Sequence, residues 1–89
     1  VVRRERVAVL LALADIQPAI TPRLKRRAAQ IEKLGFHAFD ALHLAGAEAA
    51  AADVFLTTDD RLLKTAIRMA SRLRVTVKNP LTWVAELFE

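Results

Sequence analysis

From Gly35 to the carboxyl end of the chain, helical and extended segments alternate, and this order restricts the possible folds more than any other feature of the sequence. Residue composition and spacing predict helices over residues 37–52, 59–73 and 81–88, and strands over residues 54–57 and 74–78. Strands that alternate with helices pair in parallel through right-handed crossovers. The sequence therefore predicts an α/β fold built on a short parallel sheet.

Two further helices are predicted before Gly35. Residues 3–14 contain no Gly or Pro and are rich in Leu, Ala and Arg, so we expect a largely buried helix there. A proline then predicts a turn or a very short edge strand over residues 15–20. Thr21 and the proline after it are a typical helix start, and that helix should cover residues 22–34 before Gly35 ends it.

The opening of the chain also resembles a secretory signal, with a basic start and an apolar run over residues 7–14. That run is at the short limit for such a signal and far below the roughly 18 apolar residues that span a membrane. A buried helix explains it at least as well, so we expect no membrane partner. The chain begins at Val1 rather than Met, which predicts that further coding sequence precedes it in the gene.

Composition limits the class of protein and the chemistry. The 89 residues suffice for one domain, covering 1–89, and 54% hydrophobic with 27% charged residues is typical of a globular chain. The absence of cysteine excludes disulfides and thiolate-bound zinc and is compatible with the cytoplasm that we expect. A net charge of +4 favours an anionic partner such as nucleic acid, although a solvated basic surface explains it equally well.

Two carboxylates stand where catalytic groups often lie. Asp59 and Asp60 follow the predicted strand 54–57, and sites in open α/β sheets lie beyond the carboxyl ends of strands. Asp40 lies in the first turn of the helix over residues 37–52. Each acid has a plainer explanation, because a helix start is stabilised by a capping side chain and by negative charge. If the two elements pack together, Asp40 and Asp59 face one cleft and form half of a Mg²⁺ or Mn²⁺ site.

Three neighbouring features have both a functional and a structural interpretation. His43 lies one turn beyond Asp40, where it is a packing histidine or, alternatively, a ligand or base. A stripe of basic side chains begins beside Asp59 and either tracks an RNA backbone or is the solvated face of an amphipathic helix. The lone Trp83 lies in an apolar stretch and gives no sign of base stacking. The basic stripe consists of Arg61, Lys64, Arg68 and Arg72.

The strings L-G-F-H-A-F-D-A-L-H-L-A, over residues 34–45, and D-V-F-L-T-T-D-D-R-L-L-K, over residues 53–64, together resemble the carboxyl-terminal half of PIN domains. This metal-dependent ribonuclease fold includes the VapC-like toxins of bacterial toxin–antitoxin pairs. The resemblance runs from about Arg3 to Phe88 and implies a three-layer α/β/α arrangement. It matches Asp40 and Asp59 to the third and fourth acids of a Mg²⁺ or Mn²⁺ site.

The same resemblance matches Thr57 to a supporting hydroxyl residue. Asp60 is then a second acceptor near the site or the cap of the following helix, and we favour the cap.

The family's first strand, which ends in a catalytic Asp, and the Glu that follows it have no counterpart in the sequence. The earlier acids are Glu5, Asp15 and Glu32, and none follows a predicted strand. We therefore expect a fold truncated at its amino terminus, with two of four acids and weak metal binding. An absent central strand leaves unpaired edges, which predicts homo-oligomers formed by strand exchange.

Two functions remain open from the sequence. The first is a PIN-type endoribonuclease whose activity is impaired in this truncated form. The second is a non-catalytic PIN-like module that binds RNA or a protein such as an antitoxin-like chain. A phosphorylated receiver domain, suggested by the acidic pair and Lys78, is disfavoured because receivers place their acidic pair after the first strand.

Overall fold

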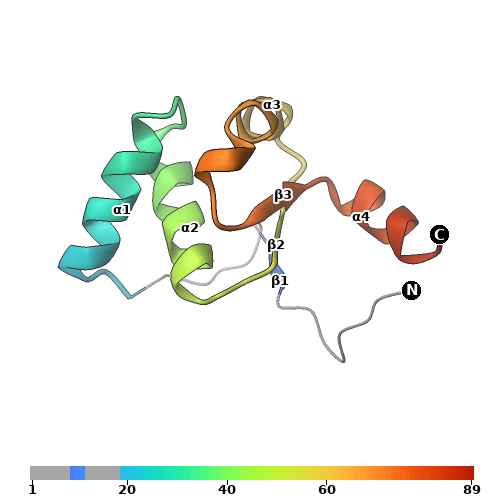
Figure 1. The fold of residues 1–89 in the computed structure, drawn as a ribbon, viewed down its shortest axis with the longest axis horizontal. Coiled ribbons are helices and arrows are strands. Elements are labelled where there is room, and N and C mark those ends of the chain that lie inside the picture. Colours follow the sequence, from blue (N-terminus) through green and yellow to red (C-terminus); the bar gives the residue numbers. More distant parts are fainter. Residues whose placement is uncertain (1–8, 12–18) are drawn as a thin grey trace.

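A computed structural model of the chain describes residues 9–11 and 19–89, and it has a mixed α/β fold. Figure 1 shows α1 and α2 side by side, with α3 and α4 on the other side of the view. The chain order is β1 (Val9–Leu11), α1 (Pro22–Glu32), α2 (Ala38–Ala49), β2 (Val54–Leu56), α3 (Asp60–Arg68), a short 3₁₀ helix η1 (Ala70–Arg72), β3 (Thr76–Lys78) and α4 (Pro80–Leu87).

The sheet has three short parallel strands in the order β1-β2-β3. Val54 in the central strand is in register with Val9 on one side and Thr76 on the other. All three residues of β2 are buried, as expected for a central strand of a parallel sheet. The predicted alternation of helices and parallel strands after Gly35 is confirmed.

The helix predicted over residues 3–14 is wrong for the part that the structure describes, because Val9–Leu11 forms strand β1. A short apolar run is compatible with a buried helix or a buried strand. Here the run forms a strand because it pairs with the edge of β2. A strand at this point was not expected from the sequence, which offered only a turn or a very short edge strand over residues 15–20 before α1. The rest of the predicted helix, residues 15–18 of that turn or edge strand, and Asp15 itself lie outside the described residues.

The helix-start signal in the sequence predicted the beginning of α1 correctly. Thr21 Oγ1 accepts a hydrogen bond from the backbone N–H of Leu24 at 3.1 Å, and Pro22 is the first helical residue. Gly35 follows the helix with a φ of +115°, a conformation that favours glycine. The helix ends at Glu32 rather than at residue 34, and a turn covers the remaining residues.

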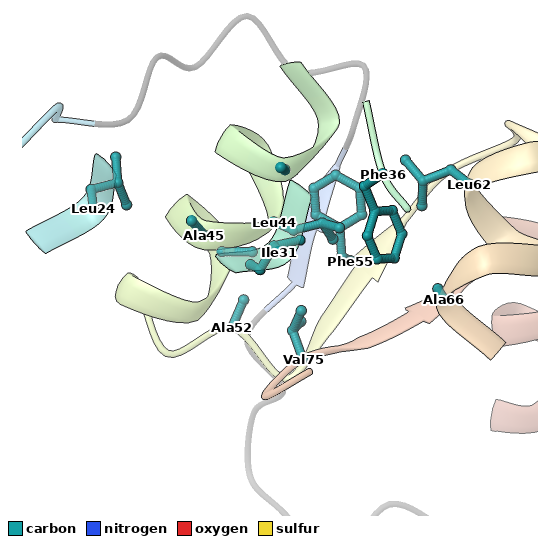
Figure 2. Packing of buried hydrophobic residues seen from close by; sticks show 12 residues of the cluster. Leu24, Ile31, Phe36, Leu44, Ala45, Ala52, Phe55, Leu62, Ala66 and Val75 are labelled. Atoms are coloured by element: carbon teal, nitrogen blue, oxygen red, sulfur yellow. The ribbon is translucent and has the colours of Figure 1, made fainter. Parts of the chain in front are cut away.

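The core lies between the sheet and the helices, where Phe55, Ile31 and Leu44 are its largest fully buried side chains (Figure 2). Figure 2 shows Leu62 and Ala66 of α3 reaching the same cluster. Such burial stabilises a domain by about 1.5–3 kcal/mol for each large apolar side chain. This cluster holds α1, α2 and α3 against β2 and β3.

The predicted helix over residues 59–73 is shorter than expected, because α3 ends at Arg68 and η1 follows it. Ile67 is 73% exposed, since α3 packs on the core through Leu62 and Ala66. The closing helix α4 forms, but no residue in it is buried. Leu81 in this helix and Phe88, which follows it, are both exposed.

An ion pair joins α1 to the last turn of α2. Arg27 Nε donates to Glu48 Oε1 at 2.7 Å, and Arg27 Nη2 donates to Glu48 Oε2 at 3.0 Å. The Glu48 side chain is only 3% exposed, so this pair is part of the interior. None of the helices in the described part of the chain is long and apolar enough to cross a membrane.

Candidate functional site

The candidate site begins where the chain leaves β2. Thr57 is buried, and its N–H donates to the carbonyl of Lys78 at 3.0 Å, which continues the pairing with β3. Its hydroxyl Oγ1 accepts a hydrogen bond from the N–H of Asp59 at 3.1 Å. The two bonds fix the path from strand to helix and commit the Thr57 hydroxyl to the backbone of Asp59, so a supporting role of Thr57 in a metal site stays a prediction.

Asp59 is the N-cap of α3. Its backbone is extended, and Oδ1 accepts from the N–H groups of Arg61 and Leu62 at 2.9 and 3.1 Å. The preference for Asp60 as the cap is therefore wrong: Asp60 is the first helical residue, and a cap needs the extended backbone that Asp59 has. Asp60 is exposed in the first turn, where its charge suits the helix dipole. Within the described residues, Oδ2 of Asp59 has no hydrogen-bond partner.

Asp40 lies in the first turn of α2, as predicted, and is half-buried. The residue at the N-cap position of this helix, His37, makes no side-chain capping bond. Negative charge from Asp40 is therefore favourable at this helix start whether or not it has a chemical role.

The starts of α2 and α3 lie at the same edge of the sheet. Only a short connection joins α2 to β2, so α2 runs back along the strand and begins at the edge where β2 ends. A direct side-chain contact confirms this proximity, because Arg61 Nη1 lies 3.0 Å from His37 Nε2. An arginine can only donate, so Nε2 is the acceptor and the proton of the neutral ring is on Nδ1. Asp40 and Asp59 thus stand in the first turn and at the cap of two helices that meet through His37 and Arg61.

His37 was not identified from the sequence, where His43 attracted attention instead. His43 Nδ1 lies 2.9 Å from the carbonyl of Phe39, and its ring meets the Phe39 ring edge-on at a centroid distance of 4.4 Å. These contacts agree with the packing interpretation of His43. The only sequence signal for His37 is its position between the helix-ending Gly35 and the start of α2.

The basic stripe is divided by the end of α3. Arg61, Lys64 and Arg68 are exposed on that helix, which supports the solvated-face interpretation and leaves them accessible to an RNA backbone. Arg68 Nη2 lies above Gly35, at 3.5 Å from the position that a Cβ would take there. Arg72 belongs to η1, so it does not continue the helical spacing of the other three.

The donor chemistry of Asp40 and Asp59 suits Mg²⁺ or Mn²⁺, but their number is small. In residues 9–11 and 19–89, no group of three or more His, Cys, Asp or Glu side chains is placed to hold a metal ion. Affinity for hard cations rises with the number of charged oxygen ligands. The described residues therefore fit a weakly held ion at most, and the metal site stays a prediction.

Comparison of the chain with protein-family models, with curated proteins and with solved structures gives no match.

Proposed function

We propose that the chain is a PIN-like module of the metal-dependent endoribonuclease class, with the three-layer α/β/α arrangement that the resemblance implies. The observation that carries this proposal is the contact between His37 and Arg61. It joins the starts of α2 and α3, where Asp40 and Asp59 lie, beyond the carboxyl end of the central strand. This is the edge at which open α/β sheets bind their ligands.

In the proposed site, Asp40 and Asp59 hold Mg²⁺ or Mn²⁺, and Asp59 is oriented by the two backbone N–H groups that it accepts from. A bound divalent ion supplies an activated water and neutralises charge on a phosphodiester. Arg61, Lys64 and Arg68 are exposed beside Asp59 and contact the RNA backbone. With two of the four family acids, we expect slow cleavage, and a cytoplasmic location would give access to RNA.

A second candidate is a non-catalytic PIN-like module that binds RNA or an antitoxin-like protein. It is favoured by the lack of a three-ligand group among the described residues. Asp59 would then serve only as the cap of α3, and Asp40 would serve only to stabilise the start of α2 through the helix dipole.

Cleavage of single-stranded RNA in the presence of Mn²⁺ tests both candidates. The nuclease proposal predicts slow cleavage that is lost in Asp40→Asn and in Asp59→Asn, because each substitution removes a charged ligand but keeps the size of the side chain. Glu32→Gln, at an exposed position of α1, is the matched control and should leave cleavage unchanged. RNA binding without cleavage in the wild-type protein would reject the nuclease proposal and support the second candidate.

Binding to the basic face is tested separately by the salt dependence of RNA affinity. Lys64→Gln removes one exposed charge from α3. The Lys64 side chain makes no hydrogen bond or ion pair with the described residues, so the substitution breaks no contact among them. The logarithmic salt slope should fall by about 0.7 if Lys64 contacts one phosphate of a single strand. An unchanged slope would show that RNA does not follow this helix.

A further inference from the structure

A second charged site lies at the opposite end of α2 from Asp40. It is a cavity of about 450 Å³ between α1, the last turns of α2 and Arg74. Glu48, at this end, is eight residues beyond Asp40, which corresponds to about 12 Å along a helix. The cavity is therefore distinct from the carboxylate edge, and no part of the proposed nuclease site uses it.

The carboxylate of Glu48, which supplies the negative charge in this cavity, already has its hydrogen-bond donors. Glu48 accepts two hydrogen bonds from Arg27 and a third, at 2.8 Å, from the backbone N–H of Arg74. Arg27 is held further by the carbonyl of Arg72 at 2.8 Å and by Gln30 Oε1 at 3.1 Å. Arg27 and Glu48 thus form a fixed, internally neutral pair in the cavity wall.

Two positive charges remain unbalanced. Arg23 and Arg74 also line the cavity, and both residues are exposed. The charge of Arg74 acts on Glu48 from a distance, but neither arginine forms an ion pair with a carboxylate of the described residues. Guanidinium groups match phosphate oxygens in geometry and bind them through paired hydrogen bonds. Most of the remaining wall is apolar, and its exposed apolar residues are Ala19 and Ala49.

We propose that this cavity binds a phosphate group on a nucleotide-sized body, with Arg23 and Arg74 on the phosphate and the wall formed by Ala19 and Ala49 against the body. The volume falls within the roughly 300–1,000 Å³ of typical small-molecule pockets. A free mononucleotide and the terminal phosphate of an RNA present the same chemistry. The proposal does not depend on metal binding or on RNA cleavage at Asp40 and Asp59.

The test is a nuclear magnetic resonance titration of the whole chain with AMP, adenosine and inorganic phosphate, followed through the backbone amide signals. AMP should shift the amide signals of Arg23 and Arg74, and adenosine should not. Arg23→Gln and Arg74→Gln should each weaken AMP binding about tenfold, since each removes a charge-assisted hydrogen bond. Arg74→Gln keeps the backbone N–H that Glu48 accepts from, so folding should be unaffected.

Lys33→Gln is the matched control, because it removes one exposed charge outside both the cavity and the proposed RNA-binding face. It should change AMP affinity less than about twofold. Competition with AMP by a 5′-phosphorylated oligonucleotide identifies an RNA end as the ligand, and failure to compete identifies a free nucleotide; either result supports the cavity. The proposal is overturned if neither AMP nor phosphate shifts these signals at about 10 mM. It is overturned equally if Lys33→Gln weakens binding as much as Arg74→Gln.

Discussion

Replacing Glu48 with Gln should destabilise this protein more than any other conservative change of a charged residue. The substitution keeps the size of the side chain but removes the charge that three donors share, at 2.7, 2.8 and 3.0 Å. Removing one partner of a buried ion pair costs about 3–5 kcal/mol. Because the Arg27 side chain is 21% exposed and water can partly solvate it, we expect about 2–3 kcal/mol.

That loss is large relative to the stability of a chain of this length. Native domains are stable by about 0.05–0.15 kcal/mol per residue, or about 4–13 kcal/mol in total here. The expected fall in melting temperature is about 10–20 °C, since each kcal/mol shifts a domain of this size by about 4–8 °C. Urea unfolding at pH 7 measures the free energy of unfolding directly. Glu32→Gln, an exposed change on α1, should stay within about 0.5 kcal/mol of wild type.

The pH dependence identifies the cause of the loss. Burial disfavours the charged form of Glu48, but hydrogen bonds from Arg27 and from the backbone of Arg74, with the charges of both arginines, outweigh it and hold the pKa of Glu48 below its ordinary value. A carboxyl group whose pKa is lower in the folded than in the unfolded protein stabilises the fold at pH values above its unfolded-state pKa. This stabilisation is lost as the pH falls through the folded-state pKa. The difference between wild type and Glu48→Gln should therefore be full at pH 7 and shrink below about pH 4.3. A difference under about 1 kcal/mol at pH 7 would refute the reasoning, because it would equal that of a surface pair.

Three further outcomes follow from single features. Asp59→Ala removes the oxygen that caps α3 and should cost about 1–2 kcal/mol in urea unfolding, whereas Asp59→Asn keeps an acceptor and should cost much less; equal losses would contradict the capping role. Gly35→Ala should lower the free energy of unfolding by about 1–3 kcal/mol because of the +115° φ, and an unchanged melting temperature would contradict this. Leu81 and Phe88 expose 81% and 84% of their surface, so light scattering at roughly tens of micromolar should show a homo-oligomer that becomes monomeric in Leu81→Ser/Phe88→Ser; a wild-type monomer would contradict the prediction.

The elements from α1 onward were predictable because their signals are local. The cap at Thr21, the glycine at residue 35 and the proline that opens α4 each act on their own turn of the backbone. Helix ends were less accurate, since α3 stops at Arg68 and η1 follows, although Met69 and Leu73 still pack against the core. The apolar spacing alone could not show that Ile67 is exposed.

Features that depend on distant pairing were not predictable. Strand β1 forms because β2 offers it an edge 45 residues further along the chain, and a three-residue apolar run carries no trace of this. Arg27 and Glu48 are 21 residues apart and look like ordinary surface charges in the sequence. His37 likewise becomes notable only when α3 brings Arg61 against it. The positions of Asp40 and Asp59 at two helix starts were predictable, but the contact that joins those starts was not.

We propose that Asp40 and Asp59 bind one divalent ion together, and paramagnetic line broadening by Mn²⁺ can detect such an ion at both side chains. We predict that about 1 mM Mn²⁺ broadens the backbone amide signals around Asp40 and Asp59 together, before those of other acids such as Glu32. Asp40→Asn should abolish the broadening at both positions, because one carboxylate cannot hold the ion alone. Broadening that is spread evenly over the exposed acids, or that persists at Asp59 in Asp40→Asn, would contradict the claim.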